Sequence, residues 1–186
     1  MNVPNTLTVM RIASVPVFVA LFLTGQMKAA LGVFIFAGVT DVLDGIAARA
    51  LKQFTKLGAA LDPLADKLLG LSAMGLLCWS HRLPFWLLWL LVFREACILT
   101  AIWILTSTGR SYVVRPTRFG KYSTFFIAAT TFFALVQGAR DVGTTPALVA
   151  LALITGELII VSWAQYLVLF IDLMGRPPQE ASAKVS

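Results

Sequence analysis

The stretch Thr40–Lys67, TDVLDGIAARALKQFTKLGAALDPLADK, carries four of the nine acidic residues of the chain. They are Asp41, Asp44, Asp62 and Asp66, and the sequence on both sides of the stretch is almost continuously apolar. Ionised carboxylates inside a bilayer are costly, so such a cluster needs protonation, basic partners, water or metal ions. The stretch therefore bears both on how the chain folds in a membrane and on the chemistry that its carboxylates can perform.

The composition is that of an all-α integral membrane protein. Of 186 residues, 59% are hydrophobic and only 13% are charged, whereas a soluble domain typically has about 25% charged residues. The net charge of +6 is typical of cytoplasmic loops that face anionic lipid. No basic segment with interleaved aromatic residues suggests binding to DNA or RNA, so we expect no nucleic-acid partner.

A membrane-spanning helix needs roughly 20 mostly apolar residues, and six apolar blocks of the chain qualify. They are Leu7–Thr24, Ala29–Arg49, Ala59–Ser80, Pro84–Thr106, Phe119–Gln137 and Pro146–Leu173. We therefore predict one domain of six transmembrane helices over residues 1–175, followed by a polar, disordered tail over residues 176–186.

The distribution of Lys and Arg sets the predicted orientation. With six spans, the termini and the second and fourth loops share one side of the membrane. That side receives Arg11, Arg49, Lys52, Lys56, Arg110, Arg115, Arg118, Lys121, Arg176 and Lys184. The other side receives Lys28, Arg82 and Arg140. We therefore expect both termini and the four aspartates at the cytoplasmic face of the cell membrane.

The spacing of the aspartates places each pair on one helix face. Asp41 and Asp44 are three residues apart near the end of the second span, and Asp62 and Asp66 are four apart near the start of the third. Pro63 is expected in the first helical turn, where its missing N–H is tolerated. Two antiparallel helices joined by a short loop would bring the pairs together.

Four carboxylates in this arrangement favour a site for two divalent cations. Mg²⁺ prefers oxygen ligands and binds through carboxylates and substrate phosphates, and two such ions can stabilise both oxygens of a phosphoryl displacement. For one isolated pair, a helix cap or a surface charge would explain the residues equally well. The small residues around Gly45 and Gly58 permit close backbone approach, either between helices or to a ligand.

The sequence resembles the CDP-alcohol phosphotransferases (CDP-alcohol phosphatidyltransferases), whose whole signature it matches as Asp41-x2-Asp44-Gly45-x2-Ala48-Arg49-x8-Gly58-x3-Asp62-x3-Asp66. The family displaces CMP from a CDP-linked substrate by attack of an alcohol hydroxyl. The resemblance implies two Mg²⁺ or Mn²⁺ ions bound by the four aspartates, with Asp66 also acting as the base. It further implies CDP contacts, which we assign to Asn5, Thr8, Gly45, Ala48, Arg49, Thr55 and Gly58.

Cations on the same side of the membrane are candidates for binding a phosphorylated acceptor. Arg110, Arg115, Arg118 and Lys121 follow the fourth span, and Arg94 lies inside it next to a glutamate. Arg suits bidentate contacts to phosphate and Lys provides a point charge. The alternatives are a loop that touches anionic lipid for Arg110 and Arg115, and an intramembrane ion pair for Arg94.

The N-terminal NVPNTLTVMRIASVPVF and the LGAALDPLADKLL segment resemble phosphatidylglycerophosphate synthases. This implies CDP-diacylglycerol as donor, sn-glycerol 3-phosphate as acceptor and a homodimer. The second lysine of their usual Gly-Lys-x-Lys-Thr pattern is replaced, since this chain reads Gly120-Lys121-Tyr122-Ser123-Thr124. Cardiolipin synthesis from phosphatidylglycerol, or another acceptor such as an inositol phosphate or serine, stays open. A cation transporter is disfavoured because no internal repeat is present.

Overall fold

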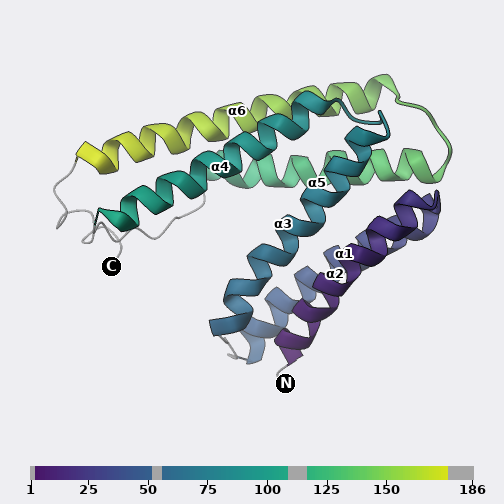
Figure 1. Cartoon of the computed structure of the whole chain (residues 1–186), viewed down its shortest axis with the longest axis horizontal. Coiled ribbons are helices and arrows are strands. Elements are labelled where there is room, and N and C mark those ends of the chain that lie inside the picture. Colours follow the sequence, from purple (N-terminus) through teal and green to yellow (C-terminus); the bar gives the residue numbers. More distant parts are fainter. Residues whose placement is uncertain (1–2, 52–55, 109–116, 176–186) are drawn as a thin grey trace. The chain divides into compact units, whose positions relative to one another are not determined.

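The computed structural model describes the backbone of residues 3–51, 56–108 and 117–175, and the side chains of residues 10–41, 67–108 and 117–175. Over these residues it contains six α-helices and no strand (Figure 1). The helices are α1 (Val3–Leu23), α2 (Met27–Leu51), α3 (Lys56–Trp79), α4 (Phe85–Ser107), α5 (Arg118–Ala139) and α6 (Pro146–Gly175). The all-α prediction is confirmed, and each predicted block corresponds to one helix.

Helices α1 and α3 begin three or four residues earlier than their apolar blocks. α1 starts at Val3 rather than Leu7, and α3 starts at Lys56 rather than Ala59. Pro63 therefore lies beyond the first turn of α3, and the prediction that it lies within that turn is wrong. The apolar block reports the hydrocarbon thickness that a helix crosses, whereas the helix itself can extend through residues such as Lys56, because Lys is a good helix former.

The described residues carry three helices that are long and apolar enough to cross a membrane, namely α4, α5 and α6. In α1 and α3 the described apolar parts are shorter, Met10–Leu23 and Lys67–Trp79. Large apolar side chains face outward, including Trp89 and Trp103, which are each 69% exposed. A water-soluble monomer rarely exposes so many, so these surfaces mark a membrane protein.

The chain divides into two compact units. The first consists of Met1–Pro84 with Thr131–Leu148, and the second of Phe85–Thr130 with Val149–Ser186. Helices α5 and α6 contribute to both units, whereas α1, α2 and α3 belong to the first and α4 to the second. The two units are described separately below.

In the first unit, α1 packs against both α2 and α3. The ring of Phe18 is fully buried and lies 6.2 Å, centroid to centroid, from that of Phe34 on α2. Ala30 and Ala37 are also fully buried, and they lie two turns apart on one face of α2. Small residues at such positions allow helix backbones to approach closely in a membrane.

Three helix ends of the first unit, those of α1, α3 and α5, are each followed two residues later by a residue with positive φ, namely Gly25 (75°), His81 (57°) and Asp141 (52°). In each case the amide of the next residue donates to a carbonyl five residues earlier, at 2.9 Å. This bond satisfies carbonyls that the helix end would leave free. The Nη1 of Arg82 then donates to the carbonyl of Val142 at 3.1 Å, which joins the second and third of these turns.

In the second unit, α6 packs against α4 and α5. A Cβ at Gly156 of α6 would lie 2.5 Å from Cζ3 of Trp86 on α4, so only glycine fits there without movement of the ring. Further along, the rings of Phe93 and Trp163 lie 5.7 Å apart. The buried hydroxyls of Thr130 on α5 and Thr155 on α6 are hydrogen-bonded at 2.7 Å.

Candidate active site

The four aspartates of the motif lie on two consecutive helices. Asp41 and Asp44 are part of α2, and Asp62 and Asp66 are part of α3. Only residues 52–55 separate the two helices, so their facing ends lie within about 18 Å of each other. The predicted helix pair with a short connection is therefore present.

Asp41 pairs with a buried arginine of α1. The Nη1 of Arg11 lies 2.9 Å from Oδ1 of Asp41, and the Arg11 side chain is 1% exposed whereas that of Asp41 is 50% exposed. A buried guanidinium requires an anionic partner, because an isolated charge is costly in a low-dielectric interior. The pair therefore joins α1 to α2 at the first aspartate of the motif and leaves the Asp41 side chain accessible.

Sequence reasoning did not single out Arg11 as a functional residue. It counted Arg11 only among the cations of the cytoplasmic side, although the residue lies within the N-terminal stretch that carries the family resemblance. The available signal was its position inside an apolar block, where a charged residue usually marks a function and has a partner. Which aspartate is that partner follows only from the packing of α1 against α2.

Arg94 forms the predicted ion pair with its neighbour in the chain. Its Nη1 donates to Oε1 of Glu95 at 2.8 Å, and its Cζ lies 5.9 Å from the ring centroid of Tyr166 on α6. Arg94 is 5% exposed, and its Nε has no hydrogen-bond partner within the part of the chain that the structure describes. The ion-pair interpretation is thus confirmed, and one donor of the guanidinium is left for a further contact.

Arg118 and Lys121 lie at the beginning of α5, and both are exposed. Thr117 caps this helix, since its Oγ1 accepts the amide N–H of Gly120 at 3.0 Å. A Cβ at Gly120 would lie 3.0 Å from the hydroxyl oxygen of Tyr166. Tyr166 therefore touches the start of α5 and also faces Arg94, which brings two of the predicted acceptor-binding elements to one side chain.

Ser123 stands at the position of the second lysine of the Gly-Lys-x-Lys-Thr pattern, and its surroundings show why a serine fits there. Ser123 is fully buried, and its hydroxyl donates to the carbonyl of Gly120 at 2.9 Å. A lysine at this position would place an ammonium group in a closed interior or force the helix to shift. In this chain the position is a packing residue, so any phosphate contact of α5 depends on Arg118 and Lys121.

The remaining predicted residues lie outside the described side chains. They are Asn5, Thr8, Asp44, Gly45, Ala48, Arg49, Thr55, Gly58, Asp62, Asp66, Arg110 and Arg115. Among the side chains that are described, no three His, Cys, Asp or Glu residues gather into a metal-binding group. The assignment of the metal ligands and CDP contacts therefore stays a prediction, to which the structure adds Arg11 as a partner of Asp41.

A family model of CDP-alcohol phosphatidyltransferases matches residues 1–168. A CDP-diacylglycerol–glycerol-3-phosphate 3-phosphatidyltransferase of Aquifex aeolicus is 31% identical over 172 residues, which cover 89% of this chain and 94% of that protein. The enzyme of the same name from Pseudomonas fluorescens is 48% identical over 84 residues, or 44% of this chain and 43% of that protein. A cardiolipin synthase (CMP-forming) of Streptomyces coelicolor is 40% identical over 115 residues, or 59% of this chain and 54% of that protein.

The chain thus spans about half or less of the length of several curated relatives, such as the 37% it covers of a probable cardiolipin synthase of Drosophila melanogaster. The Aquifex protein is matched over nearly its whole length. The names of these relatives describe two activities.

Proposed function

Because this chain belongs to the CDP-alcohol phosphatidyltransferase family, we propose that it transfers a phosphatidyl group from CDP-diacylglycerol to sn-glycerol 3-phosphate, giving phosphatidylglycerophosphate and CMP. The observation that carries the proposal is the complete eight-residue signature on the consecutive helices α2 and α3. The near-full-length match to the Aquifex enzyme supports glycerol 3-phosphate as the acceptor.

The donor set fits two divalent cations. Four carboxylates supply only oxygen ligands, which Mg²⁺ and Mn²⁺ both accept, and Asp41 has the accessible, charge-paired carboxylate that such a ligand needs. Asp41, Asp44, Asp62 and Asp66 would hold the ions. When bound, the ions neutralise the pyrophosphate and stabilise charge on the attacking and leaving oxygens.

The proton transfer and the positioning of the metal ligands depend on side chains of the chain itself. Asp66 accepts the proton of the acceptor hydroxyl as its oxygen forms a bond to the phosphatidyl phosphorus. The bond from that phosphorus to the oxygen shared with CMP breaks, and CMP leaves with the bonding electrons. Arg11 acts through Asp41, because their 2.9 Å contact holds a positive charge beside the carboxylate.

The substrate contacts follow the resemblance. Gly45, Arg49 and Thr55, with Ala48, Gly58 and the N-terminal Asn5 and Thr8, bind the CDP moiety. Arg94, Arg118 and Lys121, together with Arg110 and Arg115, bind the acceptor phosphate. The contacts of Tyr166 with both Arg94 and Gly120 support this grouping.

We propose the corresponding cellular arrangement as well. Residues 1–175 form one domain of six transmembrane helices in the cell membrane, with both termini and the motif on the cytoplasmic side, a polar tail, and a homodimeric state. The three long apolar spans and the excess of Lys and Arg in the second and fourth loops support this topology.

Cardiolipin synthesis is the second candidate, with phosphatidylglycerol as the acceptor. Two observations favour it: cardiolipin synthases are among the relatives, and Ser123 occupies the position of the second lysine. A lipid acceptor brings its own acyl chains, and so needs fewer cations than a small phosphorylated alcohol.

The experiment is CMP release by purified protein with CDP-diacylglycerol and Mg²⁺, with separate additions of glycerol 3-phosphate, phosphatidylglycerol, inositol phosphate and serine. We expect release only with glycerol 3-phosphate, and phosphatidylglycerophosphate as the lipid product. Release with phosphatidylglycerol alone would establish the second candidate. No release with any acceptor would overturn both.

A further inference from the structure

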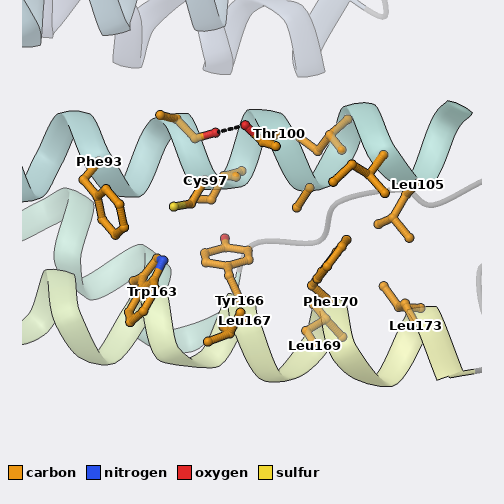
Figure 2. A pocket seen from close by; sticks show the side chains of 15 residues that line it. Phe93, Cys97, Thr100, Leu105, Trp163, Tyr166, Leu167, Leu169, Phe170 and Leu173 are labelled. Atoms are coloured by element: carbon orange, nitrogen blue, oxygen red, sulfur yellow. Dashed lines mark hydrogen bonds between the residues drawn. The ribbon is translucent and has the colours of Figure 1, made fainter.

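Tyr166 of α6 carries an unpaired hydroxyl beside an apolar groove between α4 and α6. The groove has a volume of about 320 Å³, and Figure 2 shows the ring of Tyr166 directed away from its own helix and toward α4. The hydroxyl of Thr100 on the opposite wall donates to the carbonyl of Ala96 at 2.8 Å. That of Tyr166 has no hydrogen-bond partner among the residues that the structure describes. Because Tyr166 is only half-buried, a ligand can reach this hydroxyl.

The phenol of Tyr166 lies where α4, α5 and α6 meet within the second unit. Its ring faces the guanidinium of Arg94, whose Cζ is 5.9 Å from the ring centroid. Its hydroxyl oxygen would lie 3.0 Å from a Cβ at Gly120, so the lack of a side chain on α5 at this position makes room for the phenol. Two elements of the proposed acceptor site therefore meet at one neutral hydroxyl.

The face of α6 that carries Tyr166 is polar, within a largely apolar helix. Ser162 lies one turn before Tyr166 on this face. It is fully buried, and its Oγ has no hydrogen-bond partner within the described residues. In the same part of the chain, Oε1 of Gln165 and Nε of Arg94 are also buried and unpartnered, whereas the buried hydroxyl of Ser123 donates to a carbonyl of its own helix. Unpaired polar groups in a native interior indicate a missing partner such as a water or a polar ligand.

The two kinds of group at this junction suit different parts of an acceptor. A guanidinium suits phosphate, whereas a phenol hydroxyl both donates and accepts hydrogen bonds and so suits an alcohol hydroxyl. In glycerol 3-phosphate a primary hydroxyl attacks the donor, and the secondary hydroxyl takes no part in the reaction. The headgroup of phosphatidylglycerol has the same secondary hydroxyl. Both candidate acceptors therefore present one alcohol group that the transfer leaves unchanged.

We propose that Tyr166 is a specificity-determining residue, whose phenol hydroxyl is hydrogen-bonded to the unreacting secondary hydroxyl of a glycerol acceptor. The contacts that carry the proposal are those of Tyr166 with Arg94 and Gly120, together with its unpaired hydroxyl. The inference rests on the proposed function in requiring a glycerol group in the acceptor, and it holds for either candidate acceptor. It extends the acceptor site to α6, a helix to which the family resemblance assigns no residue.

The test compares two acceptors that differ only in this hydroxyl, glycerol 3-phosphate and 3-hydroxypropyl phosphate, with CDP-diacylglycerol and Mg²⁺ at saturation. The wild type should use glycerol 3-phosphate with a kcat/KM about tenfold or more above that of the analogue, which leaves the phenol unpaired. Tyr166→Phe keeps the ring beside Arg94 and removes only the oxygen. Its kcat/KM for glycerol 3-phosphate should therefore fall about tenfold, while that for 3-hydroxypropyl phosphate stays unchanged.

The matched control is Tyr122→Phe, the same chemical change on a side chain of α5 that is 57% exposed. It should leave both kcat/KM values unchanged. An equal fall for the two acceptors in Tyr166→Phe would overturn the inference, because the hydroxyl would then contact the phosphate or only support the packing of α5. An undiminished preference for glycerol 3-phosphate in Tyr166→Phe would overturn it as well.

Failure of the inference is distinguishable from failure of the proposed function. Release of CMP with glycerol 3-phosphate and with the analogue at equal kcat/KM would count against Tyr166 alone. If the wild type uses phosphatidylglycerol instead, the same comparison is made with phosphatidyl-1,3-propanediol, and the same loss of preference is expected in Tyr166→Phe.

No release with any acceptor would count against the proposed function. Equilibrium dialysis of radiolabelled glycerol 3-phosphate against the full chain, with unlabelled 3-hydroxypropyl phosphate as competitor, then measures the preference without donor or metal. Equal competition by glycerol 3-phosphate and its analogue in the wild type would overturn the inference. A preference that is present in the wild type and lost in Tyr166→Phe would support it.

Discussion

The two units bury charge in different ways. In the first unit Arg11 and Asp41 are 30 positions apart in sequence and join α1 to α2 at 2.9 Å. In the second unit Arg94 pairs with the adjacent Glu95, and the helices are joined by aromatic rings and glycine, as at Trp86 and Gly156. In the first unit an ion pair thus joins two helices at the family motif, whereas in the second unit the helices are held together by the close fit of aromatic rings against small residues.

The largest expected effect separates chemistry from folding in the first unit. Asp66→Asn keeps the size of the side chain and removes the proposed base, so CMP release should fall by about 10²–10⁴-fold while the melting temperature changes little. The control is Asp172→Asn, the same chemical change on an exposed residue of α6 outside the motif. If Asp66→Asn releases CMP at the wild-type rate, Asp66 is not the base.

The next prediction concerns shape in the second unit. Gly156→Ala should destabilise the protein by about 1–3 kcal/mol, because the new Cβ would meet the ring of Trp86 at 2.5 Å. Gly32→Ala in α2 has no atom within 4 Å, so it should gain up to about 1 kcal/mol from helix propensity. Thermal unfolding in detergent measures both. The same sign at the two positions would show that α4 and α6 do not approach as described.

A smaller effect is expected at the ion pair between Arg11 and Asp41, which joins α1 to α2. Arg11→Gln should lower CMP release about tenfold and raise the Mg²⁺ concentration needed for half-maximal rate, since the carboxylate of Asp41 loses the side chain that positions it. Arg11→Lys keeps the charge without the planar fork and should recover part of the rate. Arg140→Gln is the control for general loss of charge. An unchanged Mg²⁺ dependence in Arg11→Gln would reduce Arg11 to a packing role.

The smallest effect is expected from loss of the hydrogen bond between Thr130 on α5 and Thr155 on α6 in the second unit. Thr155 donates to its own helix at the carbonyl of Leu151, so Thr130 donates to Thr155. Thr130→Val should cost about 0.6–1.7 kcal/mol of stability. Thr106→Val, whose exposed hydroxyl bonds only within α4, should cost less. Equal losses would mean that the contact between α5 and α6 contributes nothing.

Much of the fold follows from the sequence because apolar blocks of membrane length can satisfy their backbone only as helices. The six blocks correspond to the six helices, and their ends differ by only a few residues. The errors concern polar helix ends such as Lys56 and the position of Pro63 within α3. Hydrophobicity indicates which residues cross the hydrocarbon core, but not how far a helix extends beyond it. The positive φ of His81 and of Asp141 was also not predictable from the sequence, because neither residue type requires it.

The site was predictable in part. The aspartate cluster is visible in the sequence, and the family was identified from the resemblance to its eight-position signature, which is highly specific. The partner of Asp41 was not predictable, because Arg11 reaches it only through the packing of two helices. The role of Ser123 was also hidden: its sequence position indicated a lost lysine, but only its burial shows that the position faces the interior.

The central claim is that the charged pair of helices α2 and α3 holds two divalent cations. Its direct test is calorimetric titration of Mn²⁺ into metal-free protein in the presence of CMP. We predict two ions per chain, and loss of at least one in Asp44→Asn and in Asp62→Asn, while Asp172→Asn still binds two. One ion or none in the wild type, or two ions in both motif variants, would contradict the account.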